Sequence, residues 1–92
     1  MIKAKKIIIK GIVQGVGFRS FAHFYALRYN ISGYVKNLPD SSVEVVAKGE
    51  EKNLKDFIET VTQGPTGALI SEIINVEINE NLINFNDFRI VR

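Results

Sequence analysis

A glycine-rich stretch and one arginine are the residues of this chain whose types and spacing could do chemistry. Residues 11–19 read Gly-Ile-Val-Gln-Gly-Val-Gly-Phe-Arg, between a β-branched run and an aromatic-rich helical pattern. Glycines let consecutive backbone N–H groups converge, and a helix N-terminus adds further N–H groups and a positive dipole end. Arg19 adds a two-pronged cation that fits a phosphate. The stretch therefore predicts an anion cradle at a strand-to-helix turn.

Taken alone, the glycine loop leaves two interpretations open. Gly15-Val16-Gly17 has no third glycine at the spacing of a dinucleotide-binding fingerprint, and no Lys-Ser/Thr pair makes it a nucleotide P-loop. A tight strand-to-helix turn that needs glycine for its backbone conformation explains the pattern about as well as an anion site.

Composition limits the classes of protein to consider. The chain has 92 residues, 46% of them hydrophobic, which is enough for one small core. It has no cysteine and a single histidine, His23, so disulfides, thiolate chemistry and a Cys- or His-rich metal site are excluded. No apolar run approaches the ~20 residues of a membrane span. We therefore expect one soluble, cytoplasmic domain over residues 1–92, with no metal or cofactor and no membrane contact.

Hydrophobic periodicity predicts alternating strands and helices. We expect strands over 5–13, 34–38, 43–48, within 69–78 and over 88–91, and helices over 19–30 and 54–61, the second with a charged start at 50–52. The first strand is so rich in isoleucine and valine that both of its faces should be buried. The order predicts an α+β, ferredoxin-like βαββαβ sandwich: an antiparallel sheet with two helices on one face and a short extra C-terminal strand.

This topology places Asn37 near the glycine loop. The first two strands run parallel with the third between them, so their carboxyl ends share one edge, roughly 10 Å apart. Alternation puts Asn37 on the same face as Val35, where the first helix begins. A phosphate held in the loop, together with one water, would fill the gap.

Two motifs in register resemble the acylphosphatase family. Residues 14–19, Gln-Gly-Val-Gly-Phe-Arg, look like that family's phosphate-binding loop. Residues 33–37, Gly-Tyr-Val-Lys-Asn, are similar to its second signature, Gly-x-Val-x-Asn. The resemblance runs from about residue 5 to residue 92. One departure is the hairpin turn, where the family often has glycine and this chain has Ser41-Ser42.

The resemblance implies an enzyme that hydrolyses the carboxyl–phosphate bond of acyl phosphates to a carboxylate and inorganic phosphate. Arg19 would bind the phosphate and Asn37 would orient the attacking water. Backbone N–H groups of the loop would also bind the phosphate, at Gln14, Gly15, Val16, Gly17, Phe18 and Arg19. The partners would be a small acyl phosphate and inorganic phosphate, as product and inhibitor. We expect a metal-free reaction, broad acyl specificity and a monomer.

Three other interpretations fit parts of the sequence. RNA-recognition domains share the strand and helix order, but they carry aromatics on the third strand, and residues 43–48 have none. A non-catalytic anion-binding module would also need the loop. A carbamoyl-phosphate-handling domain at the front of hydrogenase-maturation proteins resembles the same loop, within much longer chains. His23 and the aromatics that follow Arg19 favour structural roles over a phosphate-tuning imidazole or a stacking platform.

Overall fold

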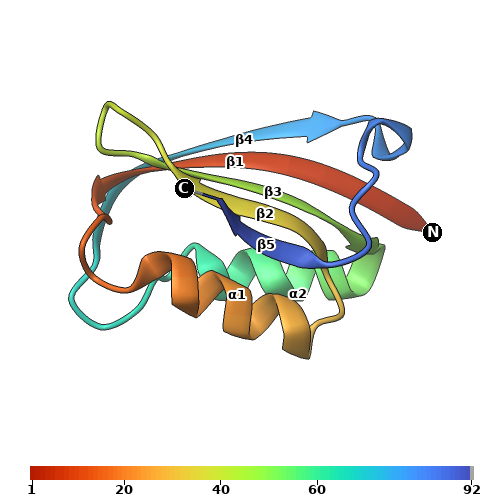
Figure 1. The fold of residues 1–92 in the computed structure, drawn as a ribbon, viewed down its shortest axis with the longest axis horizontal. Helices are drawn as coiled ribbons and strands as arrows, with labels where there is room; N and C mark the ends of the chain where they lie inside the picture. The colour runs from red at the N-terminus through yellow and green to blue at the C-terminus, as the bar shows by residue number, and fades with distance from the viewer. Residues whose placement is uncertain (92) are drawn as a thin grey trace.

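The computed structural model describes residues 1–91 and shows two layers, a five-stranded sheet and two helices packed on one of its faces (Figure 1). The elements are β1 (Ile2–Ile12), α1 (Phe18–Arg28), β2 (Ser32–Asn37), β3 (Val43–Glu50), α2 (Glu51–Val61), β4 (Leu69–Ile78), a 3-10 turn η1 (Glu80–Leu82) and β5 (Phe88–Val91). The predicted ferredoxin-like fold is confirmed. Within residues 1–91, no helix is long and apolar enough to cross a membrane.

The sheet has the order β4-β1-β3-β2-β5, with β3 between β1 and β2 as expected. The three pairings among β1, β2, β3 and β4 are antiparallel, whereas β5 pairs parallel with β2. The sheet is therefore mixed rather than wholly antiparallel. The chain leaves β4 at the end of the sheet where β2 begins. Because β5 starts from this end and lies beside β2, the two strands run in the same direction.

The core lies between the helices and the sheet. On α2, the buried residues Leu54, Phe57 and Val61 recur at i, i+3 and i+7. On α1, Ala22 and Ala26 are fully buried, and their small side chains let this helix lie close to the sheet. These helical stripes meet β-branched side chains of the central strands, among them Ile7, Ile9, Val35, Val43 and Val45.

The expectation that both faces of β1 are buried is wrong. Ile7 and Ile9 face the helices and are fully buried, but Ile8 on the opposite face is only half-buried. Both helices cover the same face, whereas on the open face Ile83 packs against Ala4 and Val46 in a small separate cluster. The isoleucine run therefore reflects the strand preference of β-branched residues as much as burial.

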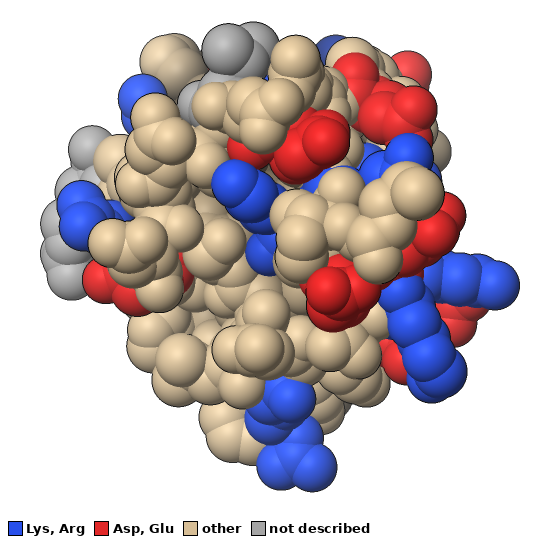
Figure 2. Space-filling view, turned by 90° about the vertical axis from the view of Figure 1, so that its right-hand side faces the viewer, with Lys and Arg blue, Asp and Glu red and all other residues tan. Residues whose placement is uncertain are grey.

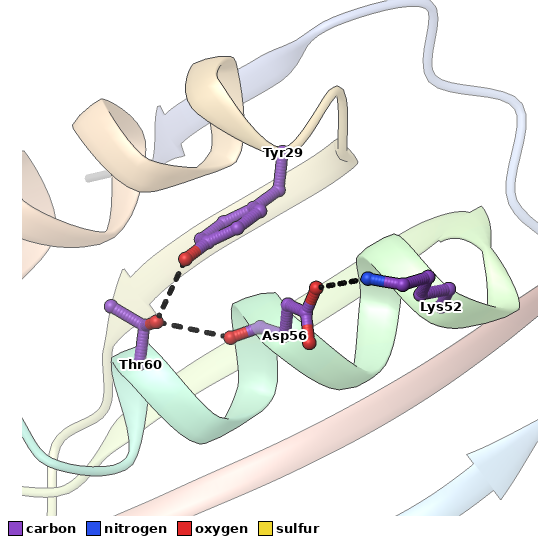
Figure 3. A network of polar contacts seen from close by, with 4 residues as sticks. All are labelled: Tyr29, Lys52, Asp56 and Thr60. Atoms are coloured by element: carbon purple, nitrogen blue, oxygen red, sulfur yellow. Dashed lines mark hydrogen bonds and ion pairs between the residues drawn. The ribbon is translucent and has the colours of Figure 1, made fainter.

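A short polar network joins the two helices (Figure 3). The Thr60 hydroxyl donates to the Asp56 carbonyl oxygen at 3.0 Å, so the Tyr29 hydroxyl must be the donor in its 3.3 Å contact with Thr60 Oγ1. Lys52 pairs with the Asp56 carboxylate at 3.3 Å on the exposed side of α2. This network fixes the C-terminal end of α1, whereas the opposite end of that helix carries the candidate site.

Candidate active site

The turn between β1 and α1 depends on two glycines in the left-handed region. Gly15 has φ 76° and Gly17 has φ 79°, a conformation that costs an L-residue roughly 1 kcal/mol. A Cβ added at either position would meet no atom within 4 Å. Both positions therefore require glycine because of the backbone conformation and not because neighbouring atoms crowd them. The space beside both glycines is open.

The N-terminus of α1 has no cap from the protein. Gly17 is the N-cap residue, no side chain accepts a hydrogen bond there, and the first turn carries no acidic residue. The first N–H to reach an intrahelical partner belongs to Phe21, which donates to the Gly17 carbonyl oxygen at 3.0 Å. The N–H groups of the preceding turn and the positive dipole end are thus available to an anion.

A small pocket joins this loop to the end of β2. Its volume is about 110 Å³. Asn37 faces it from the helix side of the sheet, two residues beyond the buried Val35. The residues that line it are Val13, Gly15, Gly17, Phe18, Arg19, Ser20 and Asn37.

The charge at the pocket is positive. No acidic residue lines it, and Arg19 is half-buried within it. The ion pairs found within residues 1–91 leave Arg19 out; they join Met1 with Glu50, Lys6 with Glu44, Lys52 with Asp56 and Arg89 with Asp87. No group of three or more His, Cys, Asp or Glu side chains in that range could hold a metal ion. An anion is the ligand that this lining favours.

Two predicted phosphate-binding positions lie outside the pocket lining. Val16 packs its side chain against the hydrophobic core. Gln14 turns its side chain toward the β2–β3 hairpin, where Nε2 donates to the carbonyl oxygens of Leu38 and Ser42 at 2.9 Å each. Any part that these two residues take in binding a phosphate would therefore come from their backbone.

Ser20 lines the pocket, and the sequence reading missed it. It is the third residue of α1 and directly follows Arg19. The sequence predicts the start of this helix and so places Ser20 in its first turn. Because the first turn surrounds any anion bound at a helix N-terminus, that position could have identified Ser20.

The hairpin beside the pocket has its own internal bonds. The Leu38 N–H donates to the Ser42 carbonyl oxygen at 2.8 Å, and the Ser41 N–H donates to the Leu38 carbonyl oxygen at 3.1 Å. Ser41 has φ 76°, the conformation for which glycine is the usual residue. The Asp40 carboxylate accepts from both the hydroxyl and the N–H of Ser42, which holds the pKa of Asp40 below its ordinary value.

The remaining candidates on α1 pack against the protein. The ring centroid of His23 lies 6.4 Å from that of Phe88, away from the pocket lining. Phe24 is 53% exposed and lies edge-on to its neighbour Tyr25 at 5.1 Å. Phe18 is buried in the core, and three further aromatics, Phe21, Tyr25 and the C-cap residue Tyr29, are half-buried against it.

Comparisons with known proteins agree on one family. A family model described as Acylphosphatase matches residues 5–90. An acylphosphatase of Caldivirga maquilingensis is 42% identical over 86 residues, which cover 92% of this chain and 90% of that protein. The crystal structure of acylphosphatase from Bacillus subtilis superposes with a TM-score of 0.92 at 37% identity and covers 100% of both chains.

The same fold also occurs as part of a longer protein. The crystal structure of full-length HypF, in its phosphate- and nucleotide-bound form, matches with a TM-score of 0.91 at 39% identity. The match covers 100% of this chain and 12% of that one. The likeness to HypF is thus limited to one small portion of that protein.

Proposed function

The chain belongs to the acylphosphatase family and has that family's enzymatic activity, and on this premise we propose how its site acts on acyl phosphates. The phosphate group lies in the glycine loop, against Arg19 and the N–H groups at the start of α1. Asn37 holds the attacking water. The observation that carries the proposal is that Arg19, an uncapped helix N-terminus and Asn37 all face one pocket of about 110 Å³.

The chemistry needs charge stabilisation more than acid–base groups. The water oxygen forms a bond to phosphorus while the bond between phosphorus and the acyl oxygen breaks, and the electron pair leaves with the carboxylate. A carboxylate leaves without protonation, so no general acid is required. In a loose transition state the charge is spread over the phosphoryl oxygens. The Arg19 guanidinium and the backbone N–H groups stabilise that charge.

Asn37 acts by position. Its amide accepts and donates hydrogen bonds but is no base at ordinary pH. It orients the water in line with the bond that breaks, and the proton of the water passes to the phosphate. This division of labour predicts that Arg19 governs binding and turnover together, whereas Asn37 governs turnover alone.

The test is hydrolysis of an aromatic acyl phosphate, followed by ultraviolet absorbance with and without a chelator, in three variants. Arg19→Ala should lose inhibition by inorganic phosphate and turnover together. Asn37→Ala should keep the inhibition constant while kcat falls on the order of a hundredfold or more. Arg28→Ala, at the far end of the same helix, is the matched control and should behave as the wild type.

Three results would overturn this function or its mechanism. Unchanged phosphate inhibition in Arg19→Ala would remove that residue from the cradle. A phosphoenzyme trapped during turnover would contradict direct attack by water. Phosphate binding without turnover in the wild type would leave a non-catalytic anion-binding module.

Charge patterning speaks against an RNA-binding module. At the end of the molecule that carries the N-terminus, basic and acidic side chains are interspersed (Figure 2). The residues of β3 carry no aromatic ring on which a base could stack.

We propose a monomer that acts on a small molecule. Light scattering of the purified protein would test the monomeric state.

A further inference from the structure

The side chain of Gln14 bridges two parts of the candidate site. It lies between the end of β1 and Gly15, and its Nε2 donates to the carbonyl oxygens of Leu38 and Ser42. The two acceptors flank the neck of the β2–β3 hairpin, 24 and 28 residues further along the chain. Leu38 directly follows Asn37. Both N–H bonds of one amide thus join the phosphate loop to the strand end that carries Asn37.

The hairpin does not need these two bonds to close. The Leu38 carbonyl oxygen already accepts from the Ser41 N–H, and the Ser42 carbonyl oxygen already accepts from the Leu38 N–H. The bonds from Gln14 are therefore additional to a turn that is complete by itself. Their effect is on the position of the hairpin relative to the loop.

The sheet alone leaves that position weakly defined. The β1–β3 ladder ends at the pair Ile9 and Val43, and the β2–β3 ladder ends at Asn37 and the same Val43. From Lys10 onward, β1 is paired with β4 only. Asn37 is thus the last residue of β2 that the ladder holds, and the loop and the hairpin turn after Asn37 extend beyond this pair with no strand between them. The amide of Gln14 spans this gap.

We propose that Gln14 is a positioning residue, which holds Asn37 at the correct distance from the phosphate loop. The proposal rests on the proposed function, because it concerns the geometry between a bound phosphate and the water on Asn37. Misplacement of a reacting group by ~1 Å costs on the order of a hundredfold in rate. Arg19 and the N–H groups of α1 do not depend on the amide of Gln14, so affinity for phosphate should survive its loss.

The experiment compares Gln14→Met, Asn37→Ala and the double variant. Methionine keeps the length and shape of glutamine but has no N–H donor. We expect kcat of Gln14→Met to fall roughly 10- to 100-fold, with KM and the phosphate inhibition constant within about threefold. The double variant should be no slower than Asn37→Ala alone, because Gln14 acts through Asn37. The control is Gln63→Met, the same substitution on the exposed α2–β4 connection, with unchanged kinetics.

A second variant tests the length of the side chain at position 14 separately from its N–H donors. Gln14→Asn keeps both N–H donors but is shorter by one methylene, so it should lose kcat as Gln14→Met does. It also keeps the test decisive if Gln14→Met does not fold. Wild-type kcat in either folded variant would overturn the proposal.

Two further outcomes distinguish this proposal from the proposed function. Losses that multiply in the double variant, or a parallel loss of phosphate inhibition, would show that Gln14 acts independently of Asn37. Those results leave the proposed function intact. Full activity of Asn37→Ala would instead overturn the role of Asn37, and the positioning role of Gln14 with it.

Discussion

Tyr34 and Asn37 lie three residues apart on β2, on opposite faces of the sheet, and their surroundings differ. On the open face, the Tyr34 hydroxyl donates to the Glu44 carboxylate at 2.7 Å, and Lys6 pairs with the same carboxylate at 3.3 Å. On the helix face, Asn37 shares a pocket with Arg19 and the uncapped start of α1. The first cluster is complete within the protein, and the second has charge that only a ligand can balance.

The difference separates two uses of polar residues. A cluster whose donors and acceptors match one another ties neighbouring strands and contributes to stability. A cluster with excess donors in a pocket is held in place by the rest of the fold and gains its partners on binding. Changes in a cluster of the first kind should therefore lower stability, and changes in a cluster of the second kind should lower activity.

The largest effect is expected at Arg19. Arg19→Lys keeps one positive charge but removes the planar guanidinium, which can donate hydrogen bonds to two phosphate oxygens at once. We expect kcat/KM to fall on the order of a hundredfold or more, with little change in the midpoint of unfolding. The measurements are steady-state hydrolysis of an aromatic acyl phosphate and denaturant unfolding.

Arg28→Lys is the matched control for this change. Arg28 lies in the last turn of the same helix, and its guanidinium is 5.7 Å from the ring centroid of Phe24. Its exchange for lysine preserves the charge at the helix C-terminus, so activity should stay at the wild-type level. Equal losses in both variants would mean that the arginines act through the helix and not through the pocket.

The next effect compares two glycines with similar backbones. Gly17 and Gly67 have φ 79° and 97°, and an added Cβ would contact nothing at either position. Alanine should therefore destabilise the protein by roughly 1 kcal/mol in both cases. Only Gly17→Ala disturbs the N–H groups of the pocket, so only it should weaken phosphate inhibition, by about tenfold.

Calorimetry and inhibition by inorganic phosphate measure the two consequences separately. Equal inhibition constants in Gly17→Ala and Gly67→Ala would show that the left-handed glycine serves the turn alone. The same outcome would favour the interpretation of the loop as a structural turn, which the sequence by itself left open.

The two helices show which helix boundaries the hydrophobic periodicity of the sequence can predict. The apolar spacing of α2 marked only residues 54–61, because its first turn carries no apolar signal, and the charged stretch 50–52 predicted the start that the structure places at Glu51. The expected helix over 19–30 ends at Arg28 instead. Asn30 adopts φ 58°, which ends the helix, while Tyr29 still packs against the core and so continued the apolar pattern.

The site shows where sequence reasoning stops. The loop glycines and Arg19 follow from local chemistry, and Asn37 follows from strand order and alternation. The bonds from Gln14 depend on the tertiary approach of a hairpin 24 and 28 residues away, and no pattern near Gln14 encodes that approach. The burial of only one face of β1 likewise depends on where both helices pack.

On the open face, Tyr34→Phe should lower stability by about 1 kcal/mol and leave activity unchanged. Burial, followed by the hydrogen bond to Glu44, raises the pKa of Tyr34 from 10.0 to about 12. The stability from the neutral hydroxyl is therefore fully present below pH 10 and is lost as pH rises toward 12. Denaturant unfolding across this range should show a smaller alkaline loss in the variant than in the wild type.

The smallest effect is expected at Asp40, in the hairpin that Gln14 contacts. Hydrogen bonds from the hydroxyl and then the N–H of Ser42 lower the pKa of this exposed carboxyl from 3.8. A lowered pKa contributes stability that is fully present above pH 3.8 and is lost as pH falls through the folded value. Asp40→Asn should therefore be slightly less stable than the wild type near neutrality, and the difference should shrink as the pH falls below 3.8. A difference that persists in acid would assign the effect to the shape of the turn and not to its charge.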